Sequence, residues 1–121
     1  MTIFIITSAI FSTNVYSKPS KQKMFEAAIG YAMCSGALAI SGKTNWKNDS
    51  LTLLKASKSS FQSILYYWPD LGSELDPEKV ALQVFHSMEQ KLPSELKAEK
   101  WALEAKCESD LLPLARIVNS N

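Results

Sequence analysis

The stretch Lys21–Ser41, KQKMFEAAIGYAMCSGALAIS, decides the expected fold. Its apolar residues recur at alternating spacings of three and four, the period of one helix face, and they are Met24, Ala27, Tyr31, Cys34 and Leu38. Residues 27–40 carry no charge, so this helix is apolar nearly all round. Such a helix lies at the centre of a bundle or in a membrane. The uncharged run falls short of the ~20 residues that a membrane span needs, which favours the bundle.

Small residues recur along the same helix. Ala28, Ala32 and Gly36 are each four residues apart, so a neighbouring helix can approach this face closely. Gly42 then ends the helix, because glycine adopts the left-handed conformation common at helix C-termini.

Two further helices are expected downstream of a polar linker, residues 43–49, that contains Trp46. Asp49 or Ser50 is expected to cap the second helix, and Pro69 ends it. Its buried stripe is expected to comprise Leu51, Leu54, Phe61, Leu65 and Trp68. Asp76-Pro77-Glu78 has the residue types of a helix start and predicts a third helix. Its inner face is expected to comprise Val80, Ala81, Val84, Phe85 and Met88.

A fourth helix should follow Pro93, with Ser94 as its cap and Leu96, Leu103 and Cys107 on its inner face. Pro113 would damage a continuous helix, so we expect a break near Ser109. A short fifth helix should follow, capped by Asp110, with apolar residues that return to the core: Leu114, Ile117 and Val118. The sequence therefore predicts an all-α fold, a compact bundle of four helices plus a short C-terminal helix.

The first 17 residues differ from the rest of the chain, because they carry no charged side chain and residues 3–11 are almost wholly apolar. Val15 and Ser17 suit the positions that signal peptidase reads, which predicts a signal peptide, residues 1–17, cleaved after Ser17. Residues 18–121 would then form a single helical domain. The usual N-terminal Lys or Arg is missing, which fits a start further upstream or a buried first strand or helix of the domain.

The cysteine pattern agrees with export. Cys34 and Cys107 are the two cysteines, and their separation does not resemble a zinc or C-x-x-C redox motif. In an oxidising compartment they are expected to form one disulfide that links the first helix to the fourth. In a reducing compartment they would be buried thiols. The predicted location is accordingly periplasmic or secreted.

Composition narrows the classes of partner. The 121 residues include 13 basic and 12 acidic side chains, a formal net charge of +1. This balance does not favour nucleic acid, whose binders usually carry a basic patch. We expect no catalytic, metal or cofactor-binding residue and no cofactor. The expected partner is another protein of unknown identity, and a homo-oligomer is compatible with the sequence.

Several motifs fit ordinary structural roles better than chemistry. Gly42-Lys43-Thr44 lacks the first glycine of a phosphate-binding loop. Ser94-Glu95-Leu96-Lys97 matches an acyl-enzyme motif but lacks its companion elements. His86 is expected at the edge of the core, and Glu104 and Glu108 on one exposed helix face. Asn48-Asp49-Ser50 is a formal glycosylation sequon.

Aromatic residues supply the one functional lead. Tyr66-Tyr67-Trp68 precedes Pro69, and Trp46 lies on the linker before the helix. A helix cannot turn three consecutive aromatics inward, so Tyr66 or Tyr67 should reach the surface. Exposed aromatics often anchor protein interfaces. Trp46, Tyr66, Tyr67 and Trp68 are therefore a candidate protein-binding patch. The alternative, the more common role for such residues, is that they only cover the end of the bundle.

In size, helicity and cysteine placement the chain is similar to bacterial immunity proteins and acid-stress chaperones, and this analogy rests on no specific motif. We expect a small exported binding protein without catalytic activity that acts by protein–protein interaction, as an inhibitor or immunity-type factor. The alternative is a small membrane-associated component that retains its N-terminal segment as an anchor. An enzyme would need a cleft whose residues the sequence does not nominate.

Overall fold

The computed structural model describes residues 20–43 and 45–120, and all regular structure in these ranges is helical. The long elements are α2 (Lys21–Ser41), α3 (Trp46–Tyr67), α4 (Pro77–Lys91), α5 (Glu95–Glu104) and α6 (Leu112–Ser120). A 3₁₀ turn, Pro69–Ser73, follows α3, and a single π-helical turn, Cys107–Leu111, leads into α6. The predicted bundle of four helices plus a short C-terminal one is confirmed. The predicted signal peptide lies outside the described residues.

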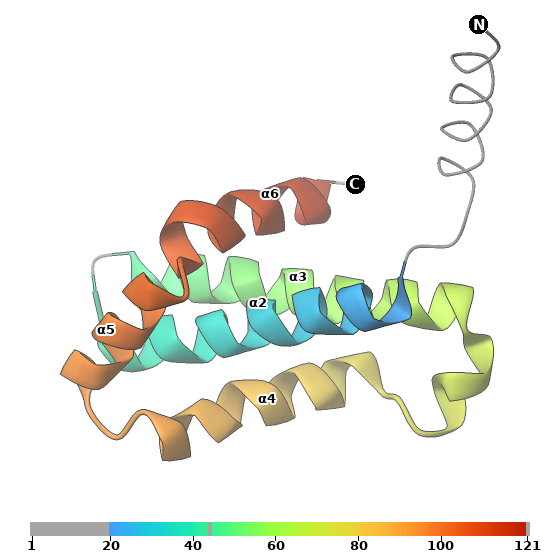
Figure 1. The fold of residues 1–121 in the computed structure, drawn as a ribbon, viewed down its shortest axis with the longest axis horizontal. Helices are drawn as coiled ribbons and strands as arrows, with labels where there is room; N and C mark the ends of the chain where they lie inside the picture. Colours follow the sequence, from blue (N-terminus) through green and yellow to red (C-terminus); the bar gives the residue numbers. More distant parts are fainter. Residues whose placement is uncertain (1–19, 44, 121) are drawn as a thin grey trace, which may run out of the picture.

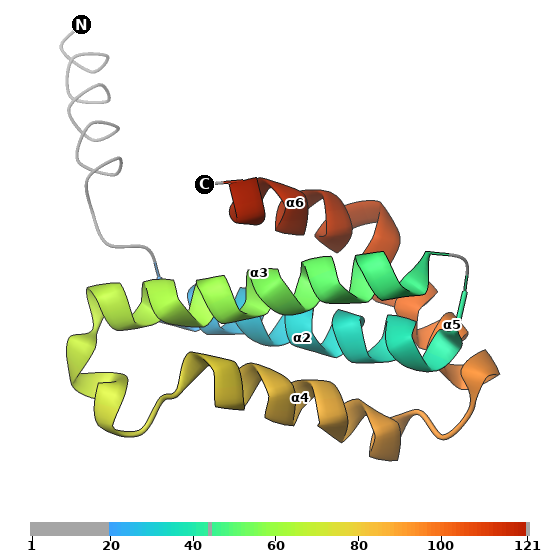
Figure 2. The same ribbon diagram turned by 180° about the vertical axis from the view of Figure 1, so that it is seen from behind.

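Helix α2 is the centre of the bundle. It packs against α3, α4 and α5, while α6 lies against α3 on the side away from α4 (Figures 1 and 2). The core includes large side chains from three helices, among them Leu38, Phe61 and Met88. Helix α2 therefore buries much of its apolar surface against the other helices of the bundle.

The row of small residues on α2 sets how closely its neighbours approach. A β-carbon added to Gly36 would lie 2.7 Å from the carbonyl oxygen of Phe85 and 2.9 Å from Cβ of Met88. Ala28 and Ala32 are fully buried in the same row. Helix α4 thus crosses α2 at a distance that only glycine permits at residue 36.

Buried serines join α2 to α3. The Ser35 hydroxyl donates to the carbonyl oxygen of Ser50 at 2.6 Å, and the Ser50 hydroxyl donates to the carbonyl oxygen of Ser35 at 2.9 Å. Further along, the Ser57 hydroxyl donates to the carbonyl oxygen of Ala28 at 2.7 Å. All three serines are buried, so these bonds satisfy hydroxyls that would otherwise be costly in the core.

The start of α3 corrects one expectation. The helix begins at Trp46, after Asn45 in the left-handed conformation with φ 66°, rather than at a cap formed by Asp49 or Ser50. Ser50 lies inside the helix, and its hydroxyl bonds to α2 rather than to the first-turn amides of α3. Other predicted ends are confirmed: Gly42 ends α2 with φ 63°, and Asp76 and Ser94 accept hydrogen bonds from first-turn amides.

The disulfide between Cys34 and Cys107 is present, with the two Cα atoms 5.5 Å apart and both residues buried. Cys107 begins the π-helical turn just after α5, so the bridge ties the centre of α2 to the junction of α5 and α6. The chain breaks at Lys106, which has φ 58°, earlier than the expected break near Ser109. The wide turn that follows accommodates Pro113, which has no N–H to donate.

The inner faces of α5 and α6 match the expectation only in part, since Cys107 is buried and Val118 packs against the core as expected. The other buried residues of these helices are Ala98, Ala102, Leu112 and Ala115. The larger apolar residues expected there are exposed, namely Leu96, Leu103, Leu114 and Ile117, and so is Leu51 on α3. Alanines allow these short helices to lie close to the central pair, which leaves the leucine faces in water.

Replacing Gly36 by alanine should destabilise the protein by about 1–3 kcal/mol, because the new methyl group would collide with α4 backbone. Gly72→Ala is the matched control, since a β-carbon there meets nothing within 4 Å. Urea unfolding of both variants measures the difference. Equal stabilities would contradict the close α2–α4 crossing.

Replacing both cysteines by alanine should lower the free energy of unfolding by about 4 kcal/mol, because the bridge closes a loop of 73 residues in the unfolded chain. Thermal unfolding of the oxidised protein and the double variant, each with and without reductant, tests this. Reductant should lower the midpoint of the oxidised protein only. A double variant as stable as the oxidised protein would show that the bridge adds nothing.

Candidate functional site: a groove beside Tyr66

The four candidate aromatics do not form one patch. Trp46 lies in the first turn of α3, whereas Tyr66 and Tyr67 lie in its last turn and Trp68 follows it. A rise of 1.5 Å per residue places Trp46 about 30 Å from Tyr66 along the helix. Trp46 therefore belongs to the opposite end of the bundle.

The three consecutive aromatics are exposed to different degrees. Tyr66 is 81% exposed, whereas Tyr67 and Trp68 are half-buried. The rings form a chain of contacts, with centroids 5.2 Å apart for Tyr66 and Tyr67 and 5.8 Å apart for Tyr67 and Trp68. Trp68 also packs against the core, and the centroid of its ring lies 5.5 Å from the ammonium nitrogen of Lys21. Of the three, Tyr66 is the side chain available to a partner.

Tyr66 stands beside an open groove of about 780 Å³ between α2, α3 and the end of α6. We call it the serine groove. Its lining is Met24, Ala27 and Tyr31 of α2, Lys55, Ser59, Ser60, Gln62, Ser63 and Tyr66 of α3, and Val118 and Asn119 of α6.

The groove exists because short side chains lie between long ones. Ala27, Ser59, Ser60 and Ser63 are short, while Met24 and Tyr66 are long. Helix α6 closes one end, where Asn119 Nδ2 donates to the carbonyl oxygen of Thr52 at 3.0 Å. The rest of this α3 face has no helix over it in the described part of the chain (Figure 1).

The polar groups of the serine groove suit binding. Burial raises the pKa of Tyr31 above its usual value, so its hydroxyl stays protonated well into the alkaline range. The Ser63 hydroxyl donates to the carbonyl oxygen of Ser59 at 3.1 Å, which leaves its oxygen able to accept. Lys55 is the charged residue of the lining. The groove thus offers hydroxyls, amides, one ammonium group and an exposed ring.

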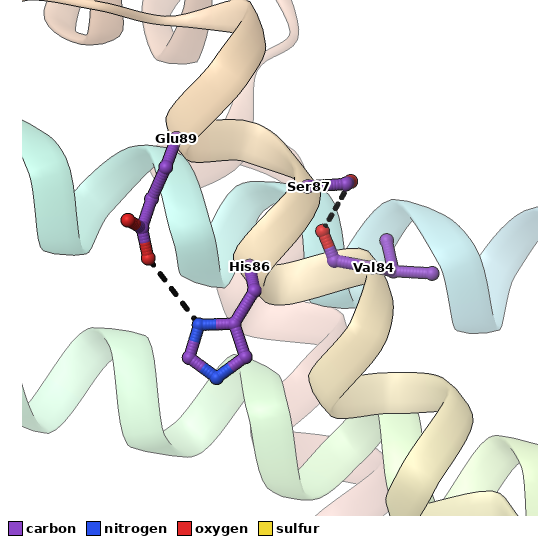
Figure 3. A network of polar contacts seen from close by, with 4 residues as sticks. All are labelled: Val84, His86, Ser87 and Glu89. Carbon is purple, nitrogen blue, oxygen red and sulfur yellow. Dashed lines mark hydrogen bonds and ion pairs between the residues drawn. The ribbon is translucent and has the colours of Figure 1, made fainter.

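His86 lies on the exposed surface of α4, away from this groove. Its Nδ1 lies 3.3 Å from Oε1 of Glu89 (Figure 3). Its ring also contacts the ring of Phe85 edge-on. The neighbouring Ser87 hydroxyl donates to the carbonyl oxygen of Val84 at 2.7 Å. The shallow hollow around His86 is lined by α4 alone, so no second element positions a group opposite the imidazole.

The remaining sequence motifs are separated or used structurally. Glu104 ends α5 and Glu108 lies in the π-helical turn beyond the left-handed Lys106, so the two carboxylates do not share one helix face as expected. In the sequon, Ser50 is buried against α2 while Asn48 is exposed. Within residues 20–43 and 45–120, His, Cys, Asp and Glu form no cluster of three or more that could hold a metal ion.

The sequence pointed to Tyr66 but missed the serine groove. Its lining residues come from three helices, and one of them, α6, is far from α2 and α3 in the sequence. The signal that could have indicated it is the set of short polar residues at 59, 60 and 63 on an otherwise amphipathic helix. Searched against protein-family models, curated proteins and solved structures, the chain shows no significant similarity to any of them.

Proposed function

We propose that this chain is a small exported helical binding protein, periplasmic or secreted, that acts by protein–protein interaction without catalytic activity. An inhibitor or immunity-type role fits such a molecule. The observation that carries the proposal is Tyr66, 81% exposed at the edge of the serine groove.

Export is supported by the covalent structure. A disulfide is compatible with an oxidising compartment, where such bonds form and persist, and Cys34 and Cys107 are buried together in the core. The apolar segment at residues 3–11 has the composition of a signal peptide.

Binding is supported by what the surface offers. Tyrosine combines a large apolar ring with a hydroxyl and is enriched among residues that dominate binding energy. Tyr66 is held at the end of a long helix whose other face is locked to α2. The adjoining hydroxyls of Ser59, Ser60 and Ser63 provide a polar surface beside the ring.

One observation supports the alternative proposal, that the chain is a membrane-associated component. Helix α2 is long and apolar enough to span a membrane by length and composition, a test that buried core helices also pass. In the bundle, α2 packs against α3, α4 and α5, and half of its most apolar window is buried. The packing favours a core helix, which leaves residues 1–17 as the candidate anchor.

Mass spectrometry of the native protein separates the two proposals. An exported binding protein should have a non-reduced mass that begins at Lys18 and includes one disulfide. A retained anchor predicts a mass that still contains residues 1–17, recovered with membranes. Two free thiols on denatured, non-reduced material would contradict export.

Tyr66→Ala should abolish recovery of a partner by the tagged full-length chain from the native exported fraction, because it removes the exposed ring. Leu96→Ala is the matched control, since Leu96 is 76% exposed and lies on α5, away from the groove. Recovery is quantified by mass spectrometry after light cross-linking. A partner retained equally by both variants would place the binding surface elsewhere, and repeated failure to recover any partner would count against the function.

A further inference from the structure

We infer that the serine groove accepts an acidic amphipathic helix from the partner, laid along α3 in line with α6. This inference rests on the proposed function and names the kind of partner surface involved. Four observations support it: the seating of α6, the uncovered length of α3, the short side chains of the groove, and the charge of Lys55.

Helix α6 shows how a helix sits on this face of α3. Two contacts show that it runs parallel to α3. Nη2 of Arg116 lies 3.9 Å from Oδ1 of Asp49, and Asn119 bonds to Thr52, one turn further along both helices. Leu112 and Ala115 are buried in the core cluster that also contains Leu53 and Ala56 of α3, while Leu114 and Ile117 are exposed. The buried face of α6 thus carries a leucine and an alanine, and a partner helix in line with it would need a similar face.

The same face continues beyond the end of α6. The register of the Thr52 contact places Ser120 beside residue 53, and α3 runs on to Tyr67. The remaining residues span about 20 Å at 1.5 Å per residue, enough for a partner helix of about 14 residues. Both ribbon views show α6 ending well before α3 does (Figures 1 and 2).

Short side chains along the groove permit close helix packing. Ser59, Ser60 and Ser63 project from α3, and Ala27 faces them from α2. Helices approach most closely where the contact residues are small. Tyr66 and Met24 stand taller and would flank the incoming helix.

The charge of Lys55 favours an acidic partner helix over a basic one. Lys55 is the charged residue of the lining, it is exposed, and it makes no ion pair with any described residue. By contrast, Lys58 on the neighbouring α3 face lies 3.6 Å from Glu78 of α4. A carboxylate on the partner helix would pair with Lys55, whereas a cation there would be repelled.

The test uses two synthetic peptides of 14 residues, both alanine-based helices with the leucine–alanine spacing of Leu112 and Ala115. One carries glutamates and its twin carries lysines beside the apolar face. Amide shifts of the oxidised, isotope-labelled full chain report binding. The acidic peptide should shift residues 55–66 of α3 and 24–31 of α2, and it should bind at least roughly fivefold more tightly than its twin, since exposed ion pairs are individually weak.

Lys55→Glu should reverse this preference, whereas Lys97→Glu, a charge reversal at an exposed position on α5, should leave it unchanged. No binding of either peptide, equal binding of both, or shifts outside the groove would overturn the inference. If any of these contrary results appears while Tyr66→Ala still abolishes partner recovery, the proposed function stands and the inference that the groove binds a helix fails. If the acidic peptide binds as expected but Tyr66→Ala leaves partner recovery intact, the groove is a helix site and the proposed function loses its anchor.

Discussion

The structure depends on the close contact between α2 and α3, where hydroxyls of one helix reach backbone carbonyls of the other. Ser35 and Ser50 exchange bonds reciprocally, and Ser57 adds a third bond to Ala28 further along. Each bond satisfies a hydroxyl buried between the two helices, so removing one partner would leave a polar group in the core without a hydrogen bond. The bonds also hold the groove-forming face of α3 in a fixed orientation toward α2.

The outer helices contribute less apolar burial, and the disulfide offsets this deficit. Apart from Leu112, the buried side chains of α5 and α6 are alanines, whereas Leu96, Leu103 and Leu114 on their other faces are exposed. A buried alanine removes less apolar area from water than a buried leucine would. Cys107 lies between these two helices and is joined to the most buried part of α2. One covalent bond therefore joins the alanine-rich outer helices to the centre of the bundle.

Periodicity predicted the helices but not which face of each one is covered. On α5, Leu96 and Leu103 recur with helical spacing, and so do Ala98 and Ala102. Hydrophobicity favours the leucines, whereas close packing against the central pair selects the alanines. The helix ends at Gly42, Asp76 and Ser94 were predictable because capping is a local interaction. Ser50 was misassigned as a cap because its bond partner lies on another helix.

The contrast between local interactions and contacts between distant residues also explains which parts of the candidate site were predictable. The exposure of Tyr66 or Tyr67 was predictable, because three consecutive aromatic residues at the end of a helix cannot all turn toward the core. Predicting the serine groove requires knowing where α6 lies along α3. That position is marked by the contact between Asn119 and Thr52, which are 67 residues apart in the sequence. A groove formed in this way exists before any partner arrives, because its walls are fixed by the core of the bundle. Preorganised walls reduce the entropy lost on binding, so a short helix and one exposed tyrosine can suffice for recognition.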